Sequence, residues 1–317
     1  MKKFLFLFCL SLLPLAGCDK DNANKEETVY TALSFAKESN EAYSIVYKDK
    51  EPLYRYEISG RLIKAEKLVV SSNDVYFFAA VGGISHPLES HYAVWKNEHL
   101  LYSYPSDGDL IDCKIINGQI YALIKGEMLS LWKNDQIINE VKRDSRTSRF
   151  YGNDIFSYDD YLQWANPDYI RKNGEILYCF PIEKGSNYHR HLYVHNGDCY
   201  LYGKGKNPNY VTIWKNQDIL YELKEDPEQF RFQDICFINN ELYLLGGPTP
   251  KQQGIWHNGE WTLYPLIFKA WCWNGNDIYT LRQIDSKNVV YKNNEKRFEL
   301  PACSDSQGNY YAIAINQ

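Results

Sequence analysis

A three-residue phrase, Trp-Lys-Asn or a close variant of it, recurs along the chain and constrains the fold more than any other feature of the sequence. Successive copies are separated by 48, 37, 39, 43, 42 and 35 residues. A period of about 40 to 50 residues is typical of one supersecondary unit copied around an array. The sequence therefore predicts seven such units, whose copies of the phrase begin at Tyr47, Trp95, Trp132, Arg171, Trp214, Trp256 and Tyr291.

Each unit divides into four short strands when apolar alternation and turn residues are followed. The second strand opens with an apolar residue and then an aromatic one, as in Ile120-Tyr121, and Asn, Gly or Asp precedes it. Those residues tolerate the positive φ that tight hairpin turns need. In one unit the four strands are expected at 231–237, 241–245, 254–256 and 260–264. We therefore expect an all-β fold, a seven-bladed β-propeller of four-stranded antiparallel blades.

The two ends of the chain leave the closure of this ring open. Residues 302–315 look like a first and a second strand, with Tyr310-Tyr311 opening the second, and residues 41–57 look like a third and a fourth. One blade built from both ends would leave no exposed sheet edge. Residues 29–34 also look like a second strand, however, which is one more than this scheme holds. Eight blades, or an extra edge strand, are the alternative.

Two repeated residue types are predicted to be structural. Aromatic side chains bury large apolar areas, so we expect Trp95, Trp132, Trp214 and Trp256 to pack between blades rather than bind a ligand. None of the six cysteines after Cys18 forms a C-x-x-C pair, which gives no support to a zinc knuckle or redox motif. Four of them recur near one repeat position, which favours small buried side chains over disulfides: Cys113, Cys236, Cys272 and Cys303.

The first residues have the pattern of an export signal. Two lysines precede an apolar run at 4–13 that is too short to span a bilayer, and the run is followed by Leu15-Ala16-Gly17-Cys18. This ending resembles the lipobox of bacterial lipoproteins, which implies that the sulfur of Cys18 carries an acyl chain such as palmitate. We expect residues 1–17 to be a signal peptide, 18–27 the acylated cysteine and a flexible polar tether, and 28–317 a single propeller domain.

Lipidation implies a partner membrane and a place in the cell envelope, as an outer-membrane lipoprotein. The acidic tether resembles the export tags of some surface lipoproteins, but Asp19 directly after the cysteine also resembles an inner-membrane retention signal. The periplasmic and surface-facing leaflets therefore both stay open. Loss of Lys2 and Lys3 changes the formal charge from -5 to -7, and the remaining basic residues are scattered, so we expect no nucleic-acid partner.

The connections between second and third strands vary in length, which places the candidate binding surface on that end of the ring. One of these connections carries exposed aromatics beside carboxylates, a combination suited to a glycan or peptide. Its candidate ligand-binding residues are Tyr158, Asp159, Asp160, Tyr161 and Trp164. The alternative is that Tyr161 and Trp164 pack the connection against the ring.

No catalytic, cofactor or metal signature is predicted. The chain has no G-x-S-x-G, phosphate-loop or H-E-x-x-H motif. His189 and His191 could share a metal with a carboxylate from elsewhere, but a solvated strand start is the alternative. Asp107, Asp109 and Asp112 lack the spacing of a calcium loop. We therefore expect a protein that is not an enzyme, without cofactors or metal ligands.

Taken together, the leader and the repeats resemble those of uncharacterised bacterial β-propeller lipoproteins with W-K-N-G type repeats. The resemblance spans nearly all of residues 28–316 and implies fold and envelope location. A looser likeness is to the propeller lipoprotein of the outer-membrane barrel-assembly machinery. We expect a membrane-anchored, non-enzymatic module that binds a glycan or peptide. The alternatives are a protein-interaction scaffold in an envelope complex and, third, a polysaccharide-active enzyme.

Overall fold

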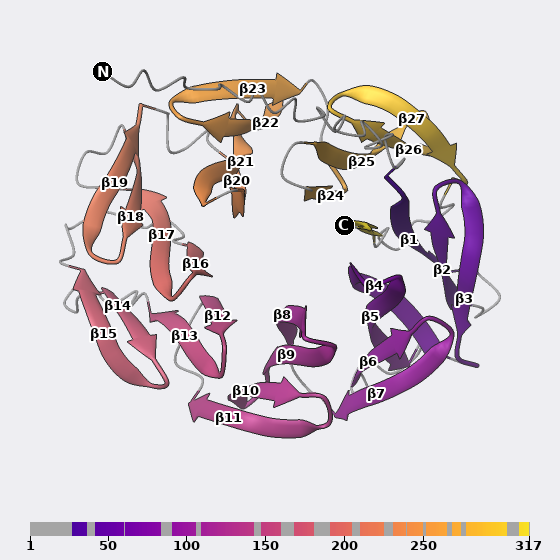
Figure 1. Cartoon of the computed structure of the whole chain (residues 1–317), viewed down its shortest axis with the longest axis horizontal. Coiled ribbons are helices and arrows are strands. Elements are labelled where there is room, and N and C mark those ends of the chain that lie inside the picture. The colour runs from indigo at the N-terminus through magenta and orange to yellow at the C-terminus, as the bar shows by residue number, and fades with distance from the viewer. Residues whose placement is uncertain are drawn as a thin grey trace, which may run out of the picture.

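The chain folds as the seven-bladed β-propeller that its repeats predict. The computed structural model describes residues 27–36, 42–59, 61–83, 91–105, 109–142, 147–159, 168–180, 191–204, 210–224, 231–238, 240–249, 252–264, 268–273, 277–302 and 311–316. Within these ranges the strands form seven four-stranded antiparallel sheets arranged in a ring (Figure 1). The described residues contain no helix that is long and apolar enough to cross a membrane.

Six blades are each built from four consecutive strands, which follow one another from the centre of the ring outward (Figure 1). The first three are β4 (Arg61–Ser71), β5 (Asp74–Gly83), β6 (His91–Lys96), β7 (His99–Pro105); β8 (Asp109–Ile116), β9 (Gln119–Lys125), β10 (Met128–Lys133), β11 (Gln136–Lys142); β12 (Thr147–Tyr151), β13 (Asp154–Asp159), β14 (Asp168–Lys172) and β15 (Glu175–Phe180). The next three are β16 (His191–His195), β17 (Asp198–Lys204), β18 (Val211–Lys215), β19 (Asp218–Leu223); β20 (Arg231–Ile238), β21 (Glu241–Thr249), β22 (Gln252–His257), β23 (Glu260–Tyr264); β24 (Ala270–Trp273), β25 (Ile278–Ile284), β26 (Lys287–Lys292) and β27 (Glu295–Leu300).

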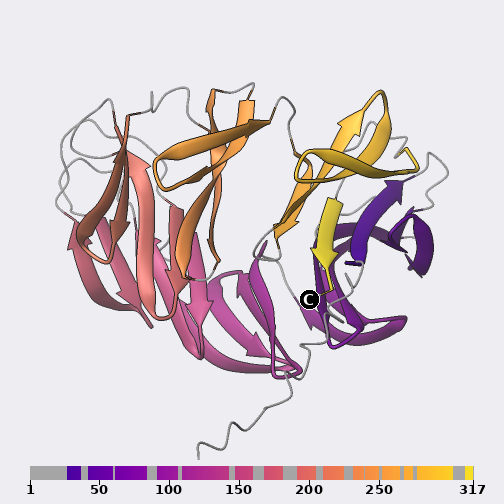
Figure 2. The same ribbon diagram turned by 45° about the horizontal axis from the view of Figure 1, so that its top comes forward.

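The seventh blade is made from both ends of the chain. Its inner strand is β28 (Tyr311–Ile315), and β1 (Val29–Ala36), β2 (Ala42–Lys48) and β3 (Glu51–Glu57) follow outward. Val29 lies opposite Ile315 in the β1–β28 ladder. Figures 1 and 2 both place β28 beside the N-terminal strands.

This closure corrects part of the sequence interpretation. Tyr311 begins the inner strand of the closing blade, so the prediction that Tyr310-Tyr311 opens a second strand is wrong. Residues 29–34 are the second strand, because β1 is held between β28 and β2. The closing blade therefore takes one strand from the C-terminal end and three from the N-terminal end. The ring has seven blades, and the eight-bladed alternative is wrong.

The Asn of the recurring phrase forms hydrogen bonds that join the end of the third strand to the start of the second strand. Asn97 turns the chain after β6 with φ 54°. Its backbone N–H donates to the carbonyl of Val75 at 2.7 Å, and its Oδ1 accepts from the N–H of Val75 at 2.9 Å. Its Nδ2 donates to Asp74, which Lys96 Nζ also contacts at 2.7 Å. The side-chain bond to the second strand recurs at Asp49, Asn134, Asn173, Asn216 and Asn293.

Replacing Asn97 with alanine is expected to lower the free energy of unfolding by about 2–3 kcal/mol. Alanine loses the side-chain bonds and must hold a left-handed conformation that Gly, Asn and Asp adopt more easily. Urea unfolding measures the change. Asn97→Gly, which relieves only the backbone penalty, should fall between alanine and wild type. A cost no larger than that of Glu98→Ala, an exposed change in the same turn, would contradict this role for Asn97.

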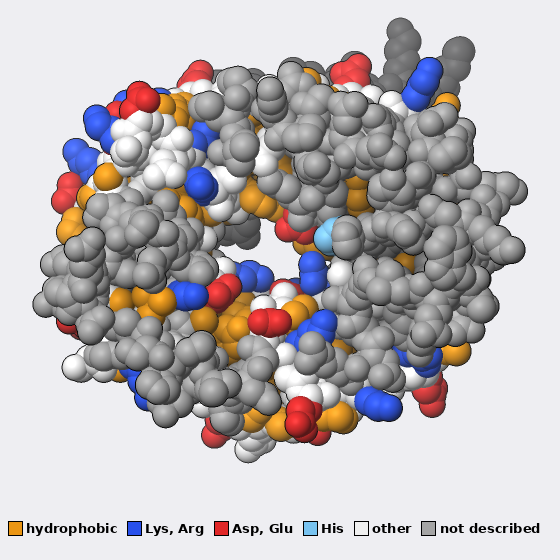
Figure 3. Space-filling view, turned by 180° about the vertical axis from the view of Figure 1, so that it is seen from behind, with side chains coloured by type: hydrophobic (Ala, Val, Ile, Leu, Met, Phe, Trp, Pro, Cys, Tyr) orange, Lys and Arg blue, Asp and Glu red, His pale blue; other side chains and the backbone are white. Residues whose placement is uncertain are grey.

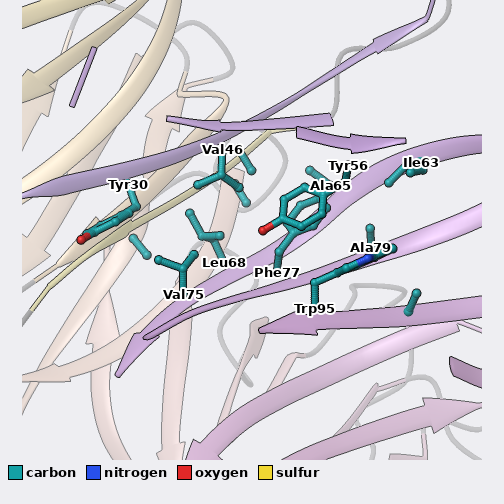
Figure 4. Packing of buried hydrophobic residues seen from close by; sticks show 14 of the residues in the cluster. Tyr30, Val46, Tyr56, Ile63, Ala65, Leu68, Val75, Phe77, Ala79 and Trp95 are labelled. Carbon is teal, nitrogen blue, oxygen red and sulfur yellow. The ribbon is translucent and has the colours of Figure 1, made fainter. Parts of the chain in front are cut away.

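The repeated tryptophans pack between blades, as predicted. Trp95 lies against Tyr56 and Phe77, with ring centroids 5.3 and 5.6 Å away, and Tyr56 comes from the neighbouring blade (Figure 4). Trp214 and Trp256 are buried in equivalent clusters, and Trp132 is half-buried. The tryptophans are therefore part of the core that joins one blade to the next.

The cysteines on the inner strands are free thiols. Cys113 is buried, as predicted, while Cys236 and Cys272 are half-buried. Burial raises the pKa of Cys113 and of Cys236 to about 12. These thiols therefore stay protonated and weakly nucleophilic at neutral pH. Cys303 lies outside the described residues.

Candidate functional site in the central channel

The two rims of the ring differ as the repeats predict. Every turn between a third and a fourth strand has two residues. The connections between second and third strands, which leave the opposite rim, have two to eight. Function in repeat folds tends to lie on the face that carries the variable connections. The space-filling view shows an opening through the centre of the ring, the central channel (Figure 3).

The structure describes little of the predicted loop site. Tyr158 lies in β13 with 1% of its surface exposed and packs in a cluster with Ile170 and Phe180. A ligand on the surface does not reach it there. Asp159 ends β13. Asp160, Tyr161 and Trp164 lie outside the described residues, as does Cys18, so their roles stay predictions.

The wall of the channel holds a set of side chains that the sequence interpretation did not bring together. In each blade, one residue of the inner strand pairs with the aromatic of the second strand. The residue two positions before it in the sequence occupies an equivalent place in every blade. These seven residues differ widely in chemistry: Lys67, Asp112, Thr147, His191, Asp234, Ala270 and Ala312. The aromatic of the second strand, by contrast, is Tyr or Phe in all seven blades. Variation at an otherwise repeated position is the signal that would have pointed to the channel.

One arc of the channel holds a bonded charge cluster that links neighbouring blades. Lys67 Nζ lies 3.3 Å from Asp112 Oδ1 and donates to the carbonyl of Cys113 at 2.8 Å. Lys114 Nζ lies 3.6 Å from Asp112 Oδ2 and donates to the carbonyl of Phe150 at 3.1 Å. Burial alone would raise the pKa of Asp112, but the two lysines hold it below its ordinary value. Both lysines therefore have a structural role.

Arg149 and Asp234 form a second charged pair, which is not bonded in this way. Arg149 Nη1 donates to the carbonyl of Ser148 at 2.8 Å, and the guanidinium lies 5.8 Å from the ring centroid of Tyr193. Asp234 Oδ1 accepts the N–H of Ile235 at 2.9 Å. Burial raises the pKa of Asp234 to about 6, against the opposing charges of Arg149 and Lys67. In the described part of the chain, no hydrogen bond or ion pair joins the two side chains.

A cavity of about 610 Å³ opens beside Asp234. Its polar lining consists of Glu66, Lys67, Asp234 and Lys269, and its aromatic lining of Trp271, Trp273 and Tyr311. The indole N–H of Trp273 is buried and finds no acceptor among the described residues. Figure 3 shows basic and acidic side chains around the channel opening. The volume lies within the range of about 300–1,000 Å³ that small-molecule sites have.

Metal ligands do not gather in the described part of the chain. No group of three or more His, Cys, Asp or Glu side chains there is placed to hold an ion. His191 begins β16, and His189 lies outside the described residues.

Comparison with known proteins establishes the class of fold. The chain matches no protein-family model and no curated protein sequence. The crystal structure of Citrobacter koseri AztD aligns with 92% of this chain and 99% of its own at a TM-score of 0.54 and 10% identity. Kluyveromyces lactis Hsv2p aligns with 90% of this chain and 96% of its own at a TM-score of 0.50 and 9% identity. At these identities the likeness shows the propeller fold alone.

Proposed function

We propose that the protein is a non-enzymatic binding module of the cell envelope, anchored to a membrane through an acyl chain on Cys18. It takes a glycan or peptide on the variable rim, with Asp160, Tyr161 and Trp164 in contact with the ligand. The difference between the two rims is the observation that carries this proposal. At one rim every turn between a third and a fourth strand has two residues, and the other rim carries connections of two to eight residues between second and third strands.

The point at which the chain enters the ring supports an orientation in which the variable rim faces away from the membrane. Val29 donates its N–H to Asp49, which lies in a short turn, so β1 starts at the short-turn rim. Glu27, just before it, contacts Lys292 Nζ at 2.8 Å and accepts a hydrogen bond from Tyr279. A tether that leaves from this point puts the short-turn rim toward the membrane. The variable rim then faces away from the membrane, where a ligand can reach it.

Binding of the mature chain to a glycan and peptide panel tests the rim site. We expect the double variant Tyr161→Ala/Trp164→Ala to lose about 100-fold in affinity, because two ring contacts are removed. Tyr151→Ala is the matched control, since Tyr151 is 45% exposed beside a short turn at the opposite rim. Full binding by the double variant would exclude this loop as the site.

A scaffold in an envelope complex is the second candidate, favoured by a set of exposed apolar side chains. They lie at the start of the outer strands in four consecutive blades, at Leu100, Ile137, Ile176 and Ile219. Aligned apolar side chains of this kind are what a partner protein covers. Copurification of envelope proteins that is lost on Ile137→Asn/Ile176→Asn, with no response to the panel, would favour the scaffold.

A further inference from the structure

We infer that the central channel is a second binding site, separate from the variable rim, for a small zwitterionic ligand that carries an ammonium group, a carboxylate and an apolar side chain. A free amino acid or a short peptide has this chemistry. Asp234 receives the ammonium group, Arg149 receives the carboxylate, and Trp271 with Trp273 packs against the apolar part.

The charged groups of the channel divide into those that satisfy one another and those that do not. Lys67 and Lys114 form ion pairs with Asp112, and each lysine also donates a hydrogen bond to a backbone carbonyl of the neighbouring blade. These three side chains therefore satisfy one another. Arg149 and Asp234 act on each other through their charges but share no bond in the described part of the chain. A guanidinium has five N–H donors, and the hydrogen bond from Arg149 to Ser148 uses one. Donors of Arg149 and an oxygen of Asp234 therefore stay available.

The separation of the two charges favours a ligand with both signs. The Asp234 carboxylate would repel a purely anionic ligand, and the positive charges of Arg149 and Lys67 would repel a purely cationic one. A zwitterion completes both partners at once, and charge-assisted bonds of this kind are the strong ones. The cavity beside Asp234 supplies Trp271 and Trp273 as an apolar wall. Its volume of about 610 Å³ accommodates more than one amino-acid residue.

The simpler alternative is that the channel charges only solubilise the wall. Arg149 and Asp234 fit that role poorly. Asp234 is desolvated enough that its pKa stands near 6, so its charge is maintained at a cost to the folded state. Strongly perturbed groups in a cavity are characteristic of functional sites.

Three probes of nearly equal size test the inference: phenylalanyl-alanine, its N-acetyl derivative and its C-terminal amide. Isothermal titration calorimetry with the mature chain should show binding of the unblocked dipeptide and about 10-fold or more weaker binding of each blocked form. Asp234→Asn should weaken the unblocked dipeptide and the amide by about 10-fold and leave the N-acetyl form unchanged. Arg149→Met should do the same to the two probes that carry a carboxylate and spare the amide.

The pH dependence supplies a readout that a structural role would not give. Asp234 loses its charge as the pH falls from 7 to 5, while the dipeptide keeps both of its own. Affinity should therefore fall over that interval, and more steeply in wild type than in Asp234→Asn, which keeps only the contribution of Glu66 in the same cavity. The charged groups that face Asp234 or line the same cavity are Arg149, Lys67, Asp112, Glu66 and Lys269. Lys67 and Lys114 hold the pKa of Asp112 below its ordinary value, whereas burial raises the pKa of Glu66, so Glu66 loses charge in the same direction as Asp234.

Several outcomes separate this inference from the proposed function. Asp218→Asn, an exposed change on β19, and Tyr161→Ala/Trp164→Ala should both leave dipeptide binding unchanged. Loss of dipeptide binding in the rim variant would move the site out of the channel. Failure of the unblocked dipeptide to bind, or equal binding of its blocked forms, would overturn the channel site and leave the rim proposal standing.

Discussion

Replacing Trp256 with alanine is expected to lower the free energy of unfolding by about 3–5 kcal/mol. The side chain is 3% exposed and sits in a cluster that joins the β16–β19 blade to the β20–β23 blade. Its ring meets Tyr221 edge-on at a centroid distance of 5.0 Å. Alanine removes this buried area and leaves a cavity between two rigid sheets. Unfolding in guanidinium chloride, followed by circular dichroism, measures the cost.

Two further variants define what the tryptophan contributes. Leu263→Ala removes an apolar side chain from the same blade, but Leu263 is 43% exposed, so a change within about 1 kcal/mol is expected. Trp256→Phe keeps a ring and should cost less than alanine. If Trp256→Ala and Leu263→Ala were equally mild, packing between blades would not be what the repeated aromatic provides.

Replacing Asp234 with asparagine is expected to stabilise the protein above pH 6, by about 1–3 kcal/mol at pH 8. Burial raises the pKa of Asp234 from 3.8 to about 6, so the folded state holds the proton more tightly than the unfolded chain does. Ionised Asp234 therefore opposes folding at high pH, by about 1.4 kcal/mol for each pKa unit and less where water screens it. Wild-type stability from this group is greatest below pH 4 and declines as the pH rises through 6.

Urea unfolding at pH 4, 6 and 8 tests the sign. The gain in Asp234→Asn should be large at pH 8, smaller at pH 6 and absent at pH 4. Asp218→Asn, which changes an exposed carboxyl, should show no such trend. A difference between wild type and Asp234→Asn that is constant across the three pH values would mean that packing or hydrogen bonding, rather than charge, separates them. A stabilising substitution that also weakens a ligand is the trade-off expected at a binding site.

The blades could be predicted from the sequence because one local requirement is met in nearly the same way in every repeat. Each turn after the third strand needs a residue with positive φ whose side chain reaches the start of the second strand. Asn97 and Asn216 meet both needs, and Asp49 meets them with a carboxylate. Requirements within about 20 residues leave a readable pattern, and the period of that pattern indicated the number of blades.

The closure could not be decided in the same way. Val29-Tyr30 and Tyr310-Tyr311 both fit the local pattern of a second strand. Which of them takes that place depends on the pairing of β1 with β28, across almost the whole chain. Local alternation carries no information about such a partner.

The channel groups escaped the sequence interpretation for a related reason. Lys67, Asp112, Arg149 and Asp234 belong to four different repeats, and each looks like an ordinary polar residue of an alternating strand. Ring geometry alone brings their charges within range of one another. Alignment of the repeats with each other, position by position, would have shown that the two inner-strand positions which these four residues occupy vary from blade to blade.

The shared seventh blade determines how the ring responds to mechanical load. A lipid tether would transmit any pull on the envelope to Glu27 and then along β1. That strand is hydrogen-bonded on both edges, to β28 and to β2. The force would act along the two ladders, so many bonds share it at once, whereas a terminal edge strand would peel away bond by bond. The pairing of the last strand with the first thus gives the chain an N-terminal strand that is held on both edges, at the point where a tether would pull.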